Sequence, residues 1–253
     1  MLLELIGAGF VVGILVGATG VGGASLMAPL LVMFFKVDPL IVVGTDLLYN
    51  APTKIVGAFV HARQGTLNLR LALDLTAGGA IGLAAGWFML RYFESRYNLG
   101  DFTSIVRHWI GMAVCLAAVL TILPSLFGTQ VVPEDSKPPS RLLLMGIGGL
   151  VGVIVMATSV GAGAITLPLL LLLRRYDVRS IVGSDLAFSA MITAVASAAH
   201  VGLGNVNLAI SMSLLLGSIP GVLIGSRFSS TSADRILRPT VGAVLLFAGL
   251  RML

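Results

Sequence analysis

The sequence predicts an all-α, polytopic membrane protein, and three observations support this fold class. Only 11% of the residues are charged and 57% are hydrophobic, with a mean hydropathy of +1.02, whereas about 25% of the residues in a soluble domain are charged. Several apolar runs approach the roughly 20 residues that cross a bilayer core. The apolar pattern also occurs twice along the chain, which is typical of secondary transporters.

Composition also limits the class of function. The net charge of +5 comes without a basic cluster interleaved with aromatic residues, so we expect no nucleic-acid partner. Cys115 is the only cysteine, which excludes an intrachain disulfide and a cysteine-based zinc site, and no motif indicates a cofactor. The start of the chain, MLLELIGAGF, lacks a basic n-region, so we expect the first segment to be retained as a membrane segment.

The duplication is direct, because residues 7–88 align with residues 146–227 without a gap and about a third of the aligned pairs are identical. The matched polar pairs are Thr19 with Thr158, Asp46 with Asp185, His61 with His200, and Asn68 with Asn207. A polar, Pro-rich stretch, GTQVVPEDSKPPS, joins the copies and indicates a linker. The predicted division is a first transmembrane repeat (1–127), a linker (128–140) and a second transmembrane repeat (141–253).

The predicted membrane segments span residues 3–35, 39–61, 70–91, 107–127, 141–174, 179–200, 206–227 and 236–253. The first and the fifth are too long for one crossing, because a helix of about 33 residues would reach about 50 Å and the bilayer core is about 30 Å thick. Each carries a Gly-rich interruption, at 17–23 or 157–163, and then a proline, Pro29 or Pro168. Glycine and proline weaken a helix, so we expect the first segment of each repeat to be broken or re-entrant.

The other segments form equivalent pairs. The segments that follow the long ones carry a stripe of polar residues. The next pair repeats glycines four residues apart, Gly82 and Gly86 in one copy and Gly221 and Gly225 in the other, a spacing that allows helices to pack closely. The last segment of each repeat is apolar. This arrangement gives about eight membrane segments of roughly 20 residues in two homologous repeats of four.

The two readings of the long segments predict different topologies. If each long segment crosses once, the repeats are parallel, whereas re-entrant segments leave three full spans per repeat and invert the copies. Lys and Arg are about twice as frequent on one side in both cases, so the positive-inside rule does not choose between them. Corresponding loops are basic in both copies, such as Lys36 with Arg174 and Arg91 with Arg227. Inverted copies would exchange this bias, so the sequence favours parallel four-span repeats.

Candidate coupling residues lie in the second segment of each repeat, on one helical face. They are Asp46 and His61 in the first copy, with Asn50 and Lys54 on the same face, and Asp185 and His200 in the second copy. Ionisable residues inside a membrane are by default candidates for substrate or proton sites, and histidine titrates in the physiological range. A structural role is the alternative: the aspartates would cap a backbone break, the histidines would lie at the interface, and Lys54 would snorkel.

Candidate binding residues lie mainly in the two breaks. Unwound backbone inside a bilayer survives only where protein or a water-filled cavity satisfies its polar groups. Half-helices starting near Ala24 and Ala164 would point N-termini, with free N–H groups and partial positive charge, into the protein. The predicted substrate-binding residues are Thr19, Gly20, Gly22, Gly23, Ser25, Asn50, Lys54, Thr158, Ser159, Gly161 and Gly163. The alternative role for the glycines is close helix packing.

Several duplicated motifs carry a resemblance to a known family. GATGVGGASLMAPLL and ATSVGAGAITLPLL, then VVGTDLL and IVGSDLA, and His-x3-Gly-x2-Asn at His61–Asn68 and His200–Asn207 resemble the sulfite exporter TauE/SafE family of membrane permeases. The resemblance implies a multi-pass permease of the cell inner (cytoplasmic) membrane and a substrate such as sulfite or an organosulfonate. Ser159 and Ala162 stand where the first copy has Gly20 and Gly23, so it does not imply equal roles for the two breaks.

These observations predict a secondary transporter of a small anion rather than an enzyme, working by alternating access around a midplane site. Asp46 and Asp185, with His61 and His200, would carry coupled protons. The alternatives are a divalent-metal transporter that uses carboxylate and imidazole ligands, a passive anion channel, and an intramembrane aspartyl protease with Asp46 and Asp185 as its dyad. Asp46 and His61 would lie about 22 Å apart along one helix, which disfavours a metal site that uses both.

Overall fold

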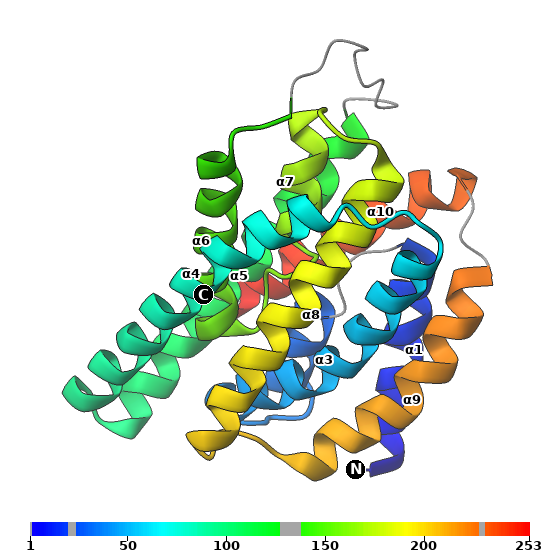
Figure 1. The fold of residues 1–253 in the computed structure, drawn as a ribbon. Coiled ribbons are helices and arrows are strands. Elements are labelled where there is room, and N and C mark those ends of the chain that lie inside the picture. The colour runs from blue at the N-terminus through cyan, green and yellow to red at the C-terminus, as the bar shows by residue number, and fades with distance from the viewer. Residues whose placement is uncertain (1, 20–23, 127–137, 228–230) are drawn as a thin grey trace.

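The computed structural model describes residues 2–19, 24–126, 138–227 and 231–253, and these residues form helices joined by turns and loops (Figure 1). The helices in the described residues are α1 (Leu2–Thr19), α2 (Ala24–Met33), α3 (Pro39–Arg63), α4 (Leu69–Arg96), α5 (Leu99–Leu126), α6 (Arg141–Thr158), α7 (Thr166–Leu173), α8 (Val178–Gly202), α9 (Leu208–Arg227) and α10 (Thr231–Met252). Helices α1 to α5 fall in the first predicted repeat, and α6 to α10 follow in the same order in the second.

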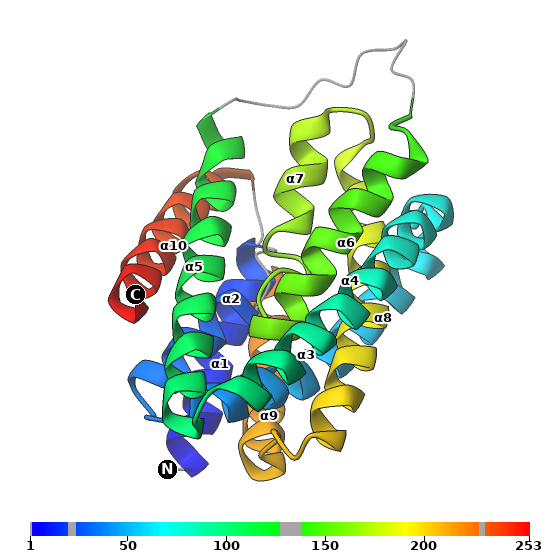
Figure 2. The ribbon, with the colours of Figure 1, turned by 90° about the vertical axis from the view of Figure 1, so that its left-hand side faces the viewer.

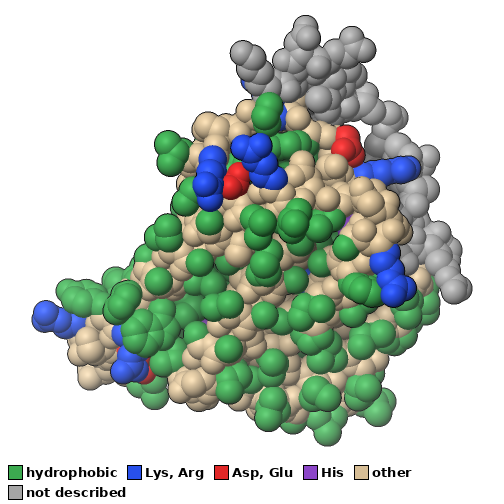
Figure 3. All heavy atoms as spheres, viewed as in Figure 1, with side chains coloured by type: hydrophobic (Ala, Val, Ile, Leu, Met, Phe, Trp, Pro, Cys, Tyr) green, Lys and Arg blue, Asp and Glu red, His purple; other side chains and the backbone are tan. Residues whose placement is uncertain are grey.

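The helices are those of a polytopic membrane protein. Within the described residues, α4, α5, α6, α8 and α9 are long and apolar enough to cross a membrane, and α1 and α10 contain shorter apolar stretches. Helix α3 has the length, but polar residues interrupt its apolar sequence. Hydrophobic side chains are spread over the whole face in Figure 3, whereas charged side chains gather near its top and at its lower left. The all-α membrane fold predicted from the sequence is therefore confirmed.

Equivalent polar residues begin equivalent helices. Asp38 and Asp177 precede α3 and α8, and Asn68 and Asn207 precede α4 and α9. In each case a side-chain oxygen accepts a backbone N–H of the first helical turn, at 2.9 Å for the aspartates and 3.1 Å for the asparagines. These oxygens replace the carbonyl partners that the first N–H groups of a helix lack. The duplicated sequence thus sets the same helix starts in both repeats.

Rows of glycine pack each repeat against the other. Helix α4 packs along α6, and α9 packs along α1. A Cβ on Gly78 or Gly82 of α4 would overlap a backbone oxygen of α6, and a Cβ on the equivalent Gly217 or Gly221 of α9 would overlap one of α1. Only glycine lets two helix backbones approach so closely. The packing role predicted for Gly82 and Gly221 is confirmed.

The contacts between helices also give their directions. Gly78 meets Met145, and Gly82 meets Gly149 one turn later, so α4 and α6 run the same way, and the row between α9 and α1 gives the same result. Asn68, which follows α3, bonds to Ser184 near the start of α8, so α3 and α8 run in opposite directions. Short loops reverse the chain from α3 to α4 and from α8 to α9 (Figure 1).

Together these directions require two re-entrant hairpins. Helix α1 runs with α3, so α2 must reverse the chain between them, and α7 must do the same between α6 and α8. In Figure 2, α7 returns toward the end of the molecule at which α6 begins. Each repeat therefore consists of one hairpin and three long helices. An odd number of full crossings inverts the second repeat relative to the first, about an approximate twofold axis in the membrane plane.

The prediction of parallel four-span repeats is therefore wrong, and the re-entrant alternative holds. A hairpin of two apolar helices has the same hydropathy as one long span, so the pattern alone could not separate them. The returning helices α2 and α7 have only 10 and 8 residues. The equivalent basic loops at Lys36 and Arg174 lie at opposite ends of the molecule, because one follows α2, the other follows α7, and these two helices run in opposite directions.

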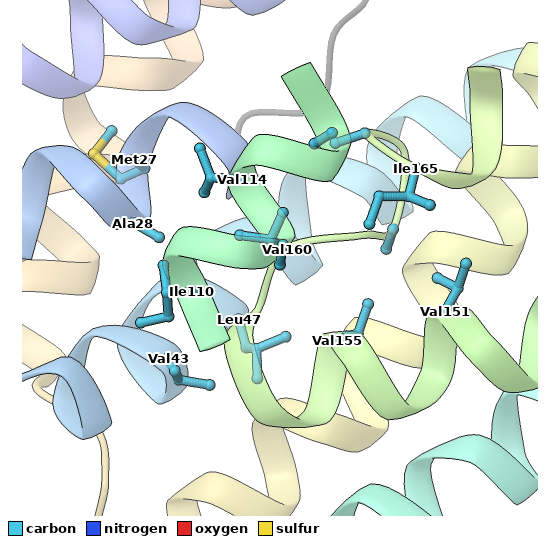
Figure 4. Close-up of a cluster of buried hydrophobic side chains, with 14 of the residues drawn as sticks. Met27, Ala28, Val43, Leu47, Ile110, Val114, Val151, Val155, Val160 and Ile165 are labelled. Atoms are coloured by element: carbon cyan, nitrogen blue, oxygen red, sulfur yellow. The ribbon is translucent and has the colours of Figure 1, made fainter. Parts of the chain in front are cut away.

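Apolar side chains hold the second hairpin against the long helices. Figure 4 shows Val160, in the turn between α6 and α7, toward Ile110 and Val114 of α5 and Leu47 of α3, whereas Ile165 lies on the other side of the turn. All five side chains are fully buried. Their dispersion contacts, individually small but numerous, fix the turn between helices from both repeats. The core therefore lies where the hairpin meets the other repeat.

We expect Gly78→Ala to destabilise the protein, because its methyl group would strike the Met145 carbonyl of α6 and overpacking of this kind costs about 1–3 kcal/mol or more. The matched control is Gly146→Ala in α6, where a Cβ would meet nothing within 4 Å and alanine favours the helix. Thermal unfolding in detergent should show a lower Tm for Gly78→Ala alone. Equal Tm values for both variants would contradict the close α4–α6 contact.

We expect the Asp177 cap to stabilise the start of α8 in a pH-dependent way. Hydrogen bonds from Ser180, through its side chain and its amide, lower the pKa of this carboxyl below its ordinary 3.8. Stabilisation is therefore complete above the ordinary pKa and is lost as the pH falls through the lower, folded value. Asp177→Ala should lose about 1 kcal/mol near neutral pH, whereas Asp177→Asn should keep most of it and lose the acid dependence. Thermal unfolding between pH 7 and pH 3 would measure both effects.

Candidate functional site

The second hairpin turns through buried backbone of unusual conformation. Ser159 follows α6 with φ of 61°, and Gly161 and Gly163 have φ of 137° and 92°. Side chains with a Cβ rarely adopt positive φ, which explains why glycine recurs here. Residues 159–168 are all buried, so the turn lies inside the protein. The break predicted at 157–163 is confirmed, and α7 begins at Thr166, two residues after the expected Ala164.

Several hydrogen-bond donors of this turn have no acceptor among the described residues. The Gly161 carbonyl accepts the amides of Ile165 and Thr166 at 2.9 and 3.3 Å. The amides of residues 161–164 donate to no acceptor in the part of the chain that the structure describes, and the fully buried Ser159 Oγ has no partner there either. These amides and Ser159 Oγ, hereafter the amide cradle, form a set of unused donors ahead of α7.

The remaining predicted residues of the breaks have other positions. Thr158 Oγ1 donates to the Ile154 carbonyl at 2.6 Å and accepts the Val160 amide at 3.2 Å, so this hydroxyl caps the end of α6. Ser25 is fully buried near the start of α2. The structure does not describe the side chains of the other predicted residues of the first break, which are Thr19, Gly20, Gly22 and Gly23.

Helix α3 brings charged groups to the amide cradle. Asp46 is fully buried and Lys54 is only 6% exposed. Lys54 Nζ donates to the carbonyl oxygen of Ala162, within the cradle segment, at 2.5 Å. Asn50 Nδ2 donates to Asp46 Oδ1 at 3.0 Å, and the Ser159 hydroxyl approaches the Asp46 carboxyl. Lys54 therefore does not snorkel to the interface, because a backbone carbonyl of the opposite repeat holds its ammonium group inside the protein.

Helix α8 supplies the equivalent polar face from the second repeat. Asp185 is 4% exposed and Ser189 is fully buried. In the described chain, Asp46 Oδ2, Asp185 Oδ1 and Ser189 Oγ have no hydrogen-bond partner. Buried polar atoms are normally paired, and leaving one unpaired costs about 1–3 kcal/mol. Unpaired atoms therefore occur on α3, on α8 and in the cradle, which marks this region as a candidate site.

Lys54 lies between the aspartates of the two repeats. A Cβ on Gly57, one turn after Lys54, would lie 3.3 Å from Leu186, the residue next to Asp185. Asp46 precedes Lys54 by about 12 Å along α3. The Lys54 ammonium interacts electrostatically with both carboxylates. The structure thus places the ionisable side chains of Asp46, Lys54 and Asp185 in one buried column where α3 crosses α8.

The two predicted histidines do not join this column. His61 is half-buried near the end of α3, where Nδ1 lies 2.8 Å from Thr66 Oγ1 in the next loop. His200 is buried, and its Nε2 lies 3.0 Å from the Met156 carbonyl at the end of α6. Nδ1 of His200 has no partner among the described residues. His61 thus contacts the loop after its own helix and packs against Gly183 of α8, two residues before Asp185, and His200 contacts the end of α6.

Two symmetric hydrogen-bonded contacts hold the repeats together, and the sequence analysis assigned them no role. The Asn207 amide donates to Thr45 Oγ1 at 2.9 Å, and the Asn68 amide donates to Ser184 Oγ at 3.0 Å. Each hydroxyl residue directly precedes an aspartate of the site. The duplicated sequences Gly-Thr-Asp and Gly-Ser-Asp, each followed by an asparagine 23 residues after the hydroxyl residue, could have indicated these contacts. Only the inverted packing shows that each hydroxyl residue meets the asparagine of the other repeat.

Charged groups at the end of the molecule where α6 begins have local roles. Asp74 of α4 pairs with Arg141 at 2.9 Å, and this contact joins α4 to the start of α6. The pKa of Tyr176, in the loop before α8, is raised above its ordinary 10.0, mainly by burial. Because the Arg141 side chain is 69% exposed, its pair with Asp74 contributes about 1 kcal/mol or less. These groups serve the helix ends and not the buried column.

Two surface hollows among the described residues have apolar linings. One, of about 430 Å³, lies between α4 and α8 beside Trp87 and Met191, and the other, of about 410 Å³, lies between α5 and α6 beside Trp109. Neither lining contains a charged side chain, so neither suits an anion. No three His, Cys, Asp or Glu side chains come together in the described chain, so the structure offers no support for the divalent-metal alternative.

We expect Ser184→Ala to weaken the contact between the repeats. The Ser184 hydroxyl accepts the Asn68 amide and donates to the Asn68 carbonyl at 3.1 Å. The carbonyl keeps the Ala72 amide as a partner, so removal of the hydroxyl leaves the Asn68 amide unpaired, at about 1–3 kcal/mol for a buried group. Ser104→Ala, at an exposed position, is the control. Chemical denaturation in detergent should show a lower midpoint for Ser184→Ala only, and an unchanged midpoint would argue against the contact.

Comparisons with known proteins agree with this architecture. The family model described as sulfite exporter TauE/SafE matches residues 5–252. The chain is 34% identical over 261 residues to the probable membrane transporter protein YjnA of Bacillus subtilis (strain 168), with 100% of both chains covered. It is 25% identical to a probable membrane transporter protein of Xylella fastidiosa (strain 9a5c), over 97% of this chain and 94% of the relative. No solved structure matches the chain.

Proposed function

Since the chain belongs to the sulfite exporter TauE/SafE family of membrane proteins, we propose that it is a secondary transporter of a small anion. The proposed substrates are sulfite, an organosulfonate, or a related sulfur-containing or carboxylate anion. The family and the names of the relatives indicate a membrane transporter rather than an enzyme. The choice of anion rests on the chemistry of the buried site.

The observation that carries this proposal is the amide cradle beside Lys54. Backbone N–H groups at the start of a helix, together with its dipole, favour negative charge. Because α7 is short, the dipole alone would be a weak argument. The buried Ser159 hydroxyl, which approaches Asp46 without a hydrogen bond, and the Lys54 ammonium, held on Ala162 at 2.5 Å, supply further donors at the same place. A sulfite, sulfonate or carboxylate oxygen would accept these hydrogen bonds.

The inverted repeats supply a route to alternating access. When two repeats of one fold are inverted in the membrane, exchange of their conformations turns an outward-facing protein into an inward-facing one around a fixed site. Helices α3 and α8, which carry the aspartates, cross between the repeats. We place the coupled protons on Asp46 and Asp185, because they are the buried carboxyl groups nearest the cradle, and we assign no proton to the histidines.

Charge at the two ends suggests the orientation. Arginines cluster at the end where α6 begins, and among the described side chains they are Arg63, Arg70, Arg141, Arg174, Arg175 and Arg179. The opposite end has Lys36, Arg91, Arg96, Arg107 and Arg251. In the sequence, Arg227, Arg235 and Arg238, where α9 ends and α10 begins, add to the first end. The positive-inside rule then places the first end in the cytoplasm, for a protein of the inner (cytoplasmic) membrane with its N-terminal end outside.

We expect loss of one cradle donor to weaken anion binding. Ser159→Ala should raise the KM for uptake into proteoliposomes about tenfold, since a hydrogen bond to a charged group contributes about 1.5–3 kcal/mol. Gly163→Ala should do at least as much, because φ of 92° strains any residue with a Cβ. Uptake would be measured with sulfite, methanesulfonate, isethionate and simple carboxylates.

Gly146→Ala, far from the cradle on an open face of α6, is the control and should match the wild type. Unchanged KM values in both cradle variants would overturn the site. Saturation of uptake and counterflow of labelled anion would identify a carrier, whereas flux without counterflow would identify the passive channel.

A further inference from the structure

We propose that transport is electroneutral, with one proton carried for each monovalent anion, because Lys54 is the single counter-ion shared by Asp46, Asp185 and the substrate. This inference rests on the proposed function, and it adds the charge class of the substrate and the stoichiometry of coupling. It follows from the positions and numbers of the buried charges.

Few charged side chains lie around the site. Lys54 is the only buried Lys or Arg among the described side chains, and it interacts with both Asp46 and Asp185. Tyr49, on the same helix, and Ser218 of α9 lie near Asp46. His61 packs against Gly183, two residues before Asp185, and its Nδ1 bonds to Thr66 Oγ1. The other elements packed against this part of α3, which are α2, α5, α6 and α8, bring no further charged side chain to it among the described residues. The balance therefore involves two carboxyls and one ammonium.

The second step is the balance of the empty site. With both carboxylates ionised the site carries one net negative charge, and an uncompensated buried charge is strongly unfavourable. Taking one proton from water onto one carboxyl leaves a single carboxylate paired electrostatically with Lys54. The unpartnered atoms Asp46 Oδ2 and Asp185 Oδ1 are positions where that proton can be held. The empty site is then neutral.

The third step is the balance of the loaded site. A monovalent anion that binds the cradle takes Lys54 as its partner, and the remaining carboxylate loses its counter-ion. Taking a second proton from water onto that carboxylate restores neutrality. The loaded site holds one more negative charge and one more proton than the empty site, and no other bond is made or broken. Release of the anion on the other side returns that proton to water.

The position of Lys54 in the duplicated chain gives the substrate class. The equivalent residue in α8 is Thr193, so the inverted scaffold supplies two carboxyls but only one ammonium. A divalent anion would leave one negative charge uncompensated even with both carboxyls protonated. The site therefore selects monovalent anions, such as hydrogen sulfite, a sulfonate or a monocarboxylate.

Uptake of methanesulfonate and isethionate into proteoliposomes tests the stoichiometry, because these sulfonates take up no proton themselves. A potassium gradient with valinomycin sets the membrane potential, and an internal dye reports the pH. We expect one proton to enter with each anion and the initial rate to be unchanged by the potential. An initial rate that follows the potential, or uptake without a change in internal pH, would overturn electroneutral coupling. Absence of uptake of every anion tested would instead overturn the proposed function.

Variants separate the role of Lys54 from that of the aspartates. Asp46→Asn with Asp185→Asn leaves only the ammonium, so the double variant should carry the anion without a proton and respond to the potential. Asp185→Asn alone leaves one carboxylate to exchange and should keep one proton per anion. Lys54→Met should lose uptake of monovalent anions, and Thr193→Val, at the equivalent place in α8, should keep wild-type coupling.

These outcomes remain decisive if Lys54→Met does not fold. Thermal unfolding in detergent would identify misfolding, and the double asparagine variant then decides the matter by its proton count alone. A double variant that still carries one proton per anion would show that the protons bind elsewhere. A folded Lys54→Met variant with normal uptake would show that the ammonium is not the partner of the anion.

Discussion

The structure depends on how unwound backbone inside a membrane obtains hydrogen-bond partners. A bilayer core offers no water, so each free N–H or C=O must be satisfied by protein or by a polar cavity. The turn between α6 and α7 meets this constraint partly from within, through the Gly161 carbonyl, and partly from the other repeat, through Lys54 on the Ala162 carbonyl. A long helix of one repeat therefore supplies a hydrogen bond to the re-entrant hairpin of the other, and this contact joins the two halves of the duplicated sequence.

The other close helix contacts also join one repeat to the other. Helix α4 lies against α6 and α9 lies against α1, each through glycines that let the backbones touch, and Thr45 and Ser184 each bond to an asparagine of the opposite repeat. Contacts of this kind are rigid along a helix pair, whereas the crossing of α3 and α8 lies between the two glycine-packed pairs. Each glycine-packed pair contains one helix from each repeat, and the polar residues of α3 and α8 lie between the two pairs.

Much of this architecture could be predicted from the sequence, and the reasons for the failures are physical. Low charge and long apolar runs predicted membrane helices, and the clustered glycines predicted the break at Gly161 and Gly163. The direction of the chain after the break could not be predicted, because hydropathy records burial and not direction. The fate of Lys54 was also open, since its partner is a backbone carbonyl that the sequence represents only as an alanine. The hydrogen bonds of Thr45 and Ser184 could not be predicted, because their partners lie more than 100 residues away, across the interface between the repeats.

An inverted duplication gives two equivalent sets of residues, and the differences between the sets show where one half has acquired a separate role. The aspartates are retained in both halves, whereas Lys54 faces Thr193 and Ser159 faces Gly20 in the alignment. A symmetric scaffold needs no such pair, because helix packing and capping are served by residues present in both copies. The ammonium comes from the first repeat and the extra hydroxyl from the second, yet the inverted packing brings both to the same turn of backbone. Two differences between the halves, one in each repeat, therefore meet at the same turn, where Lys54 Nζ donates to the Ala162 carbonyl three residues after Ser159.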